Sequence, residues 1–378
     1  MDDSQYPYAG LPRVVIETKD FGELRDRETF LDAHLQVYGK KAPESGVMEL
    51  KVRGRGNSSF KMPKYGMKLK FPNKVSMFGM PENKEWALVG NFGDKTYLRN
   101  YMMYRLSEWL GAAYTPKMCF VELYLNRKYM GLYLLSETVK AGKNRVNIPK
   151  DETSFLLEKE SSNKYDDPFV KTNSGYIFHI NSPKDPSPEA MDLVVEHLND
   201  FEDQLFRNHF VGENIEDWVD LDALALYYWV QEYSKNEDGN FLRSIFFTWQ
   251  VGGPVRFGPL WDFDLAFGNA SRESVKPYDE WYIRTNKWCS SLYGMSEVKE
   301  KFKSYWLENR ATFAALIDSV PLYRSMIEPA VKNELKRWPI MSNTENWALK
   351  EPYGSYDEAV EAMVNWMKAR HKWIDENL

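Results

Sequence analysis

Two aspartates, Asp262 and Asp264, lie in the otherwise apolar stretch FGPLWDFDLAFGN (257–269). If this stretch is a strand, residues two apart point to the same face, and both carboxylates share one small volume. At roughly 6 Å and an effective dielectric constant of about 20, the two charges repel by roughly 3 kcal/mol. A bound cation would remove this repulsion, and so would protonation of one carboxyl. The alternative is that one aspartate caps the following turn and the other faces water.

A third carboxylate, Asp238, stands in EYSKNEDGN (232–240), where a helix-forming run gives way to a loop. Negative charge at the carboxyl end of a helix opposes the helix dipole, so Glu237 and Asp238 are unfavourable there. A residue that breaks a local rule is a candidate for function. Asp238 is therefore a candidate general base that accepts a proton from a substrate hydroxyl. The alternative is a plain helix cap at Asn236 or Gly239.

The run RGRGNSS (53–59) predicts a tight turn between two strands. Glycines let the backbone approach a ligand closely, and successive amides in such a turn can bind an anion. Arginines beside the turn would add charge-assisted hydrogen bonds to a phosphate. An ordinary hairpin turn with solvated arginines is the alternative. The candidate phosphate-binding residues of this run are Arg53, Arg55, Gly56, Asn57 and Ser58.

Two lysines alternate with apolar residues in YGMKLKF (65–71), a pattern typical of a strand with one buried face. Lys68 and Lys70 then lie on the opposite face, where either can hold a phosphate as a compact point charge. Lys70 is the better candidate because it lies further from the Gly66 turn. Solvated lysines on an edge strand, which discourage aggregation, are the alternative for this pair.

These pieces occur in a suggestive order along the chain. An anion-binding turn, a strand lysine, a loop aspartate and a downstream metal-binding pair follow one another as the parts of a kinase do. None of them is specific alone, since the turn is neither a P-loop nor a kinase glycine-rich loop. Their joint order favours a phosphoryl-transfer site. Magnesium is commonly held by one or two carboxylates together with substrate phosphates.

The elements that must position these residues change character along the chain. Strands are expected first, followed by a helix over 94–111 and a hairpin over 118–137 that turns at 126–128. A polar, basic connector (139–151) follows, and amphipathic helices over 187–206 and 221–234 come after it. Two further strands are expected over 242–250 and 254–268, and the chain is helical from about residue 298. The other expected strands cover 11–20, 47–60, 65–71 and the short run 154–160.

This order predicts an α+β fold with two lobes. A β-rich lobe over 1–148, with a mainly antiparallel sheet, would be followed by a mainly helical lobe over 149–378. Ligands favour a cleft between two such lobes. The aromatic content of 15% and hydrophobic content of 43% suit a chain that folds around one large core or two adjoining cores.

Composition also excludes several classes of function. The net charge of -6 argues against a nucleic-acid-binding protein. Two cysteines and five histidines without metal-ligand spacing leave only carboxylate sites for a hard cation. The sequence has no apolar run of eighteen residues, so no transmembrane helix is expected. The start MDDSQYPYAG lacks the pattern of a secretion signal, which leaves two expectations, an intracellular protein or a secreted one whose signal is absent here.

The longest motifs resemble one known family. The runs RGNSS, PKYGMKLKF, LRNYMMYRLSEWLG, VELYLNRKYMGLYLLSE and GPLWDFDLAFGN are similar to the spore-coat protein H (CotH) kinase-like family, over about residues 11–306. Members of that family are atypical protein kinases with a two-lobed, protein-kinase-like fold. The resemblance implies that this chain binds ATP with Mg²⁺ or Mn²⁺ and phosphorylates Ser or Thr of a protein substrate.

The resemblance also implies roles for individual residues. Asp238 matches the catalytic-loop aspartate, and Asp262 with Asp264 matches the metal-binding motif. Lys70, or else Lys68, falls where the family has its nucleotide-pairing lysine. Glu137 lies near the adenine, where the chain leaves the first lobe.

The chain departs from ordinary kinases at four points. No His-Arg pair precedes Asp238, and Asp264 replaces the glycine of D-F-G. A second metal ligand would have to be Asn236, Asn240 or Asp264. The glutamate that pairs with the lysine has only two weak candidates, which are Glu108 and Glu122.

Three classes of function remain open from the sequence. The leading hypothesis is an ATP-dependent phosphotransferase, with AMP transfer as a variant if ATP binds in the opposite direction. The second is a catalytically inactive, kinase-like surface, scaffold or binding protein. The third is a hydrolase that uses Asp262 and Asp264 as an acid–base pair, since same-face carboxylates lie near the separation of about 5 Å found in retaining glycosidases.

Overall fold

The computed structural model describes residues 4–39, 46–161, 168–346, 349 and 351–378. The chain divides into two compact units, each assembled from separate stretches of sequence. The first unit comprises residues 1–101, 116–138 and 319–362, and the second comprises 102–115, 139–318 and 363–378.

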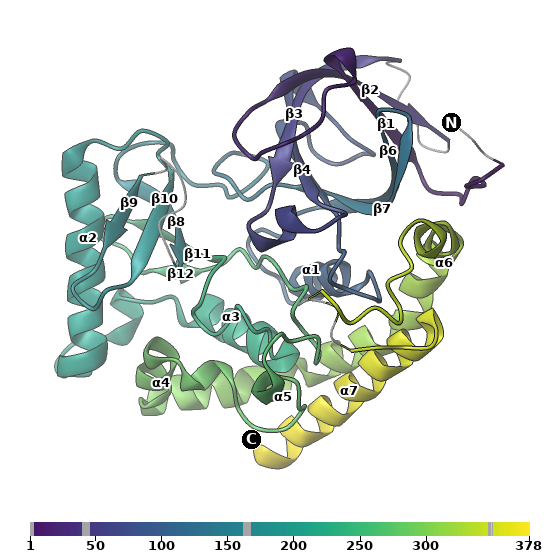
Figure 1. The fold of residues 1–378 in the computed structure, drawn as a ribbon. Helices are drawn as coiled ribbons and strands as arrows, with labels where there is room; N and C mark the ends of the chain where they lie inside the picture. Colours follow the sequence, from purple (N-terminus) through teal and green to yellow (C-terminus); the bar gives the residue numbers. More distant parts are fainter. Residues whose placement is uncertain (1–3, 40–45, 162–167, 347–348, 350) are drawn as a thin grey trace. The chain divides into compact units, whose positions relative to one another are not determined.

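Seven strands of the first unit form a closed barrel in the order β1-β2-β3-β4-β5-β7-β6 (Figure 1). Neighbouring strands pair antiparallel except at the closure, where β1 runs parallel to β6 with Val14 opposite Leu123. The strands are β1 (Arg13–Thr18), β2 (Leu31–Tyr38), β3 (Met48–Arg55), β4 (Gly66–Val75), β5 (Asn83–Val89), β6 (Met118–Leu125) and β7 (Lys128–Glu137).

Alternation along each strand fills the barrel. Met67, Leu69 and Phe71 are at most 2% exposed and belong to the barrel core, whereas Lys68 and Lys70 point outward. Successive side chains of a strand point to opposite faces, so the outward lysines are a direct consequence of burying their neighbours. The predicted strand over 65–71 and its two faces are confirmed.

The β6–β7 hairpin turns where the sequence predicts it. Asn126 and Arg127 both have positive φ, 50° and 67°, as a two-residue hairpin turn of matching twist requires. Asn126 also accepts a hydrogen bond from Thr18 N at 2.9 Å through its side-chain Oδ1. This residue therefore joins the hairpin to β1 beside the closure of the barrel.

The helix α6 (Val320–Arg337) packs on β7, and a buried ion pair joins this helix to Lys64, which precedes β4. Lys64 Nζ lies 2.6 Å from Glu334 Oε1, and neither side chain is exposed. Glu334 Oε2 also accepts a hydrogen bond from Leu132 N at 2.6 Å. The first unit further contains the 3-10 turns η1 (Lys19–Phe21) and η2 (Ser58–Lys61).

The second unit contains a five-stranded antiparallel sheet in the order β12-β11-β8-β10-β9, with α2 lying alongside it (Figure 1). Its strands are β8 (Ser154–Glu160), β9 (Phe169–Lys171), β10 (Ile177–Ser182), β11 (Ile245–Gln250) and β12 (Arg256–Phe257). Ser187 caps α2, because its hydroxyl accepts a hydrogen bond from Ala190 N at 3.1 Å.

Helices make up most of the rest of the second unit. Two helices cross the boundary between the units in sequence, α1 (Arg99–Trp109) and α7 (Tyr356–Asn377). The helices within the second unit are α2 (Pro188–Asp203), α3 (Leu221–Ser234), α4 (Lys287–Tyr293) and α5 (Ser296–Asp318). It also contains the short π-helix η3 (Gln204–Asn208) and the 3-10 turns η4 (Ile215–Asp217), η5 (Glu273–Val275) and η6 (Ile283–Thr285).

The expected α+β fold with a two-lobed, protein-kinase-like arrangement is wrong. The first sheet closes into a mixed barrel, and a second sheet stands in the part of the chain expected to be mainly helical. Periodicity reports which face of a strand is buried but not which distant strand it pairs with, so the closure of β1 on β6 could not be anticipated. The functional division at residue 148 stays a prediction.

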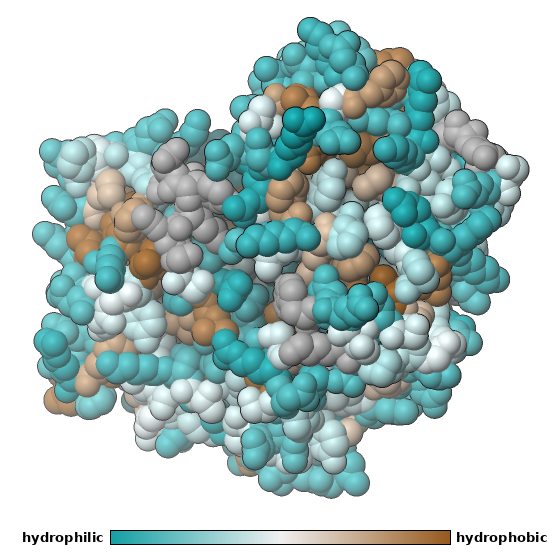
Figure 2. Space-filling model, viewed as in Figure 1, coloured by the Kyte–Doolittle hydropathy of each residue, from teal (hydrophilic) through white to brown (hydrophobic). Residues whose placement is uncertain are grey.

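On the face shown in Figure 2, hydrophilic residues cover most of the surface and apolar residues form small separate groups. Within the described part of the chain, no helix is both long enough and apolar enough to cross a membrane.

Candidate functional site

The loop that carries Asp238 begins at a left-handed residue. Lys235 ends α3 with φ 44°, and its N–H bonds back to the carbonyls of Gln231 and Glu232. We call residues 235–244 the α3–β11 loop, since β11 starts directly after it. The left-handed cap reverses the chain and turns residues 236–238 away from the helix axis.

Asn236 joins this loop to the WDFD segment (residues 261–264). Its Nδ2 donates to Gln231 Oε1 and to the Asp262 carbonyl oxygen, both at 3.0 Å. Its Oδ1 is buried and accepts no hydrogen bond from any residue that the structure describes. A buried amide oxygen without a donor is costly, so this oxygen is suited to an added ligand such as a hard cation.

Asp238 is a partly buried carboxyl with an arginine beside it. Arg243 Nε lies 3.3 Å from Asp238 Oδ1, and the Asp238 side chain is 13% exposed. Burial raises the pKa of Asp238 to about 7, Arg243 opposes this rise, and the carboxylates of Asp262, Glu237 and Glu160 add to it. A carboxyl with a pKa near 7 can accept and return a proton under physiological conditions.

Glu237, next to it, has a structural role. Its carboxylate accepts hydrogen bonds from Ser271 N (2.6 Å), Ser271 Oγ (2.7 Å) and Arg272 N (3.1 Å). These bonds offset its unfavourable position beyond the carboxyl end of α3. Of the two acids that oppose the helix dipole, Glu237 fastens the loop, and the role of Asp238 as a proton acceptor stays a prediction.

The expected strand over 254–268 is wrong. The strand β12 covers only Arg256–Phe257, and Asp262 has φ 68°, so strand alternation does not place Asp262 and Asp264. Buried aromatic neighbours place them instead. Trp261 stacks on Tyr104 with ring centroids 5.6 Å apart, and Phe263 meets the same ring edge-on at 6.3 Å. Burial of residues 261 and 263 leaves both aspartates half-buried.

The third candidate metal ligand, Asn240, is already engaged. Its Nδ2 donates to Thr285 Oγ1 at 3.1 Å, and its Oδ1 accepts from Asn286 Nδ2 at 3.0 Å. Within the described ranges, no group of three or more His, Cys, Asp or Glu side chains could hold a metal ion. A set of Asn236, Asp262 and Asp264 has only two carboxylates, which suits an ion that keeps part of its coordination for water or phosphate.

In the first unit, the register of β3 and β4 brings the predicted cations together. Arg53 stands opposite Lys68, and Lys51 stands opposite Lys70. Directly opposed like charges destabilise a sheet, so this face is a candidate anion site. Lys68 Nζ lies 3.2 Å from Glu85 Oε2 and is partly buried, whereas Lys70 is exposed.

The turn between these strands is held by a further arginine. Gly56 has φ 108°, a conformation that suits glycine, and η2 follows it directly. Arg27 Nη1 donates to the Gly56 carbonyl at 2.8 Å and to Asn57 Oδ1 at 3.3 Å. Arg55 and Ser58 are half-buried at the two sides of this turn.

The glutamates named as candidates from the sequence have other partners. Glu137 is buried and accepts from Lys117 N at 3.0 Å. Glu122 pairs with Arg13 at 3.2 Å, and Glu108 pairs with Arg105. The partner of Lys68 is Glu85, which was not among the candidates. The available signal was its position in the run that follows YGMKLKF, the next strand along the chain.

The structure has a barrel with opposed cations on two strands and a second unit whose loops carry partly buried carboxyls. The model of the CotH kinase protein family matches residues 52–374. The chain therefore belongs to the CotH kinase family, and this membership indicates a kinase-like function. No curated protein matches the chain. The predicted resemblance is confirmed, and the match extends past residue 306 into α7.

Proposed function

We propose that this protein is an ATP-dependent phosphotransferase that phosphorylates Ser or Thr hydroxyls of a protein substrate. The observation that carries the proposal is the pairing of Asp238, a carboxyl with a raised pKa, with Asn236, whose buried Oδ1 has no donor among the described residues. Both residues interact with Asp262. The carboxylate of Asp262 raises the pKa of Asp238, and Asn236 donates a hydrogen bond to the Asp262 carbonyl. Proton acceptors and oxygen ligands are the two kinds of group that phosphoryl transfer needs close together.

Asn236, Asp262 and Asp264 would hold the divalent ion, Mg²⁺ or Mn²⁺. Bound there, the ion would neutralise negative charge on the phosphates. The orphaned Oδ1 of Asn236 supports this assignment, and all three ligands offer the oxygen atoms that hard cations prefer.

Asp238 would act on the acceptor. It would accept the proton of the Ser or Thr hydroxyl as the hydroxyl oxygen bonds to the γ-phosphorus and the bond from that phosphorus to ADP breaks. The ion pair with Arg243 orients the carboxyl. Orientation and charge neutralisation supply most of the rate in this class of reaction.

The opposed cations of β3 and β4 would bind the phosphates in this proposal. Arg53 offers a planar fork for two phosphate oxygens, whereas Lys68 and Lys70 offer point charges. Arg55 and the amides of Gly56, Asn57 and Ser58 would extend this site into the turn. Glu137 remains the proposed residue near the adenine. Its carboxylate accepts from Lys117 N at 3.0 Å, and its own N–H donates to the Lys117 carbonyl at 2.9 Å.

Thermal unfolding of the wild-type protein tests the proposal. A ligand at about 100 times its dissociation constant adds about 2.7 kcal/mol to the free energy of unfolding, which is a shift of about 3 °C for a chain of this length. We expect this shift with ATP plus Mn²⁺ and a smaller one with either alone. No shift at saturating ATP and Mn²⁺ would overturn the proposal. Labels on the γ- and α-phosphates then distinguish phosphoryl from AMP transfer.

Substitution of the two lysines separates their roles. Lys68 is partly buried and paired with Glu85, so its charge is oriented and poorly screened, whereas Lys70 is solvated. We expect Lys68→Ala to weaken ATP binding about tenfold and Lys70→Ala about twofold, the reverse of the order expected from distance to the turn. A fluorescent ATP analogue measures both constants. Lys84→Ala, at an exposed lysine of β5, is the control, and a larger effect at Lys70 would favour the order expected from distance.

A further inference from the structure

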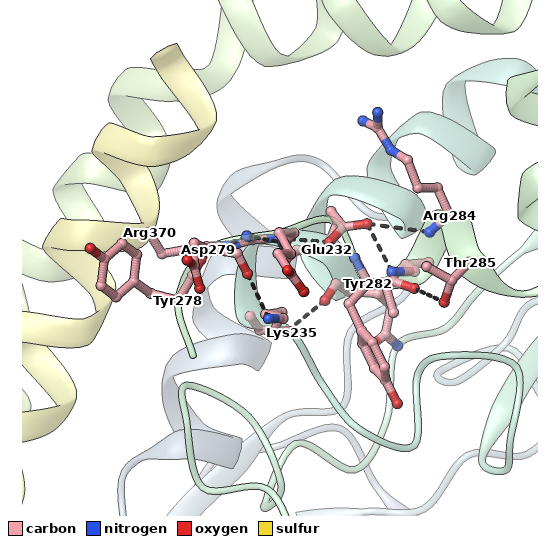
Figure 3. Close-up of polar contacts among 12 residues, drawn as sticks. Glu232, Lys235, Tyr278, Asp279, Tyr282, Arg284, Thr285 and Arg370 are labelled. Carbon is pink, nitrogen blue, oxygen red and sulfur yellow. Dashed lines mark hydrogen bonds and ion pairs between the residues drawn. The ribbon is translucent and has the colours of Figure 1, made fainter. Parts of the chain in front are cut away.

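The segment formed by residues 276–286, which we call the 276–286 segment, is fastened by a buried arginine of α7. Arg370 Nη1 donates to the carbonyls of Tyr278 and Glu280, both at 2.7 Å. Its Nη2 donates to Glu232 Oε1 at 2.7 Å and to the Glu232 carbonyl at 2.9 Å (Figure 3). Neither side chain of this ion pair is exposed.

Glu232, the partner of Arg370, binds the amides of the same segment. Its carboxylate accepts hydrogen bonds from the backbone N–H groups of Tyr282 and Ile283 at 2.8 Å and of Arg284 at 3.3 Å. Figure 3 shows these bonds converging on one side chain of α3. A single buried carboxylate therefore satisfies three backbone donors in a row.

Lys235, the first residue of the α3–β11 loop, also binds the segment. Its Nζ donates to the carbonyls of Pro277 and Asp279, both at 2.7 Å. Cations thus hold the carbonyls of the segment, and an anion holds its amides. Burying so many charges is costly and gives little net stability, so such an arrangement is better explained by the fixed geometry it imposes.

The 276–286 segment contacts the residues on either side of Asp238. The hydroxyl of Tyr282 donates to the Glu237 carbonyl at 3.1 Å. Tyr282 also interacts with the Asn240 side chain, which bonds Thr285 and Asn286 as well. The segment therefore contacts the loop one residue before Asp238 and two residues after it.

We infer that Tyr282 is a positioning residue for Asp238. In this inference Arg370 of α7 holds the 276–286 segment, and with it Tyr282, in place. The inference rests on the proposed function, since it assigns Asp238 the proton-accepting role. The backbone of Tyr282 is held by the hydrogen bond from its N–H to Glu232, and not by its hydroxyl. The hydroxyl is therefore available for the loop, and removing it separates the positioning of Asp238 from the folding of the segment.

Tyr282→Phe deletes the hydroxyl, and with it the hydrogen bond to the Glu237 carbonyl and the interaction with the Asn240 side chain. We expect kcat for transfer from ATP to casein, used as a generic Ser/Thr acceptor, to fall about tenfold, because one lost bond to the loop costs about that factor. The KM for ATP and the melting temperature should stay at wild-type values. Tyr278→Phe is the matched control, because Tyr278 is 44% exposed and it is its main-chain carbonyl that binds Arg370.

Hydrogen–deuterium exchange gives a readout that does not depend on activity. In Tyr282→Phe, amides of the α3–β11 loop such as those of Gly239, Leu242 and Arg243 should exchange faster, while those of α3 should not. Faster exchange in the loop, with no transfer by wild type or variant, would overturn the proposed function while leaving the contact proven. Unchanged exchange and unchanged kcat would overturn the positioning role itself.

Variants of Arg370 test the anchor. Arg370→Lys keeps a positive charge beside Glu232 but loses the planar fork that reaches three carbonyls, and Arg370→Met loses both. We expect exchange in the 276–286 segment to increase in the order wild type, Lys, Met, and kcat to fall in the same order, by about tenfold for Lys. A folded Arg370→Lys protein with wild-type exchange and kcat would show that α7 does not anchor the segment.

Discussion

Asp238→Asn should lower phosphoryl transfer by about 10²- to 10⁴-fold, the range that a general base contributes. The amide cannot accept the proton of the acceptor hydroxyl, yet it has the shape of the carboxyl and leaves the backbone of the loop unchanged. ATP affinity should stay within about twofold of wild type, because the proposed phosphate contacts lie elsewhere. Transfer from γ-labelled ATP to casein, measured beside equilibrium binding of the same nucleotide, checks both expectations.

Asp217→Asn serves as the control, since Asp217 is an exposed aspartate of the same unit. If ATP binding in the presence of Mn²⁺ collapses in Asp238→Asn together with transfer, Asp238 is a metal ligand and the assignment of a base is wrong. If transfer continues at the wild-type rate, no proton acceptor is needed at this position.

The same variant also has a stability signature that depends on pH. The pKa of Asp238 is raised by burial to about 7 in the folded protein, above its ordinary value of about 3.9. The unfolded chain therefore loses this proton at lower pH than the folded protein, and stability falls as pH rises from about 4 to about 7. With chelator present, Asp238→Asn should melt at a higher temperature than wild type at pH 8, and the difference should shrink towards pH 4. A difference that does not change with pH would contradict the raised pKa.

Single elements of the fold were well predicted from the sequence. The predicted helix over 221–234 coincides with α3, because the pattern begins after the cap Asp220, whose carboxylate accepts from Ala223 N at 3.0 Å. The expected helix over 94–111 is shorter in the structure, since Asp94 binds Thr96 N and Arg99 N in a turn before α1. Gly111, with φ 77°, ends this stretch as predicted.

The WDFD segment shows why a correct periodicity can predict the wrong element. Trp261 and Phe263 are buried, at 7% and 0% exposed, and they alternate with two polar residues as in a half-buried strand. Here residues 261–264 are not part of a strand. They alternate because Trp261 and Phe263 both pack against the ring of Tyr104 from α1. Only the tertiary partner distinguishes the two cases, and that partner lies more than 150 residues earlier in the chain.

The sequence indicates candidate site residues but not the residues that support them. Asp238 and Asp262 stand out as acids in apolar or unfavourable surroundings, which is a local signal. The contact between Asn236 and the Asp262 carbonyl depends on how two distant loops meet. Arg370 is a charged residue in an otherwise amphipathic helix, and its burial against Glu232 has no local sequence signal.

Asp262→Asn should lower transfer about as strongly as Asp238→Asn does. It removes one of the two carboxylates proposed for the divalent ion, and the loss of that ion should lower transfer by about 10³-fold or more. The stabilisation by ATP plus Mn²⁺ should disappear in thermal unfolding, while the variant without ligand should melt at or slightly above the wild-type temperature, because a neighbour that repels Asp238 is gone. Asparagine also tolerates the φ of 68° at this position, so the backbone need not change.

A matched control exists for this substitution, because Asp20 has a φ of 54° and is exposed. Asp20→Asn repeats the same change of charge at another left-handed aspartate and should keep both the thermal shift and the transfer rate. Asp264→Asn then tests the second carboxylate. If Asp262→Asn and Asp264→Asn both retain full transfer, neither aspartate holds an essential ion, and the acidic pair in this apolar segment needs another explanation. If only Asp262→Asn is inactive, the ion is held by Asp262 and Asn236, the two residues that the hydrogen bond at 3.0 Å already joins.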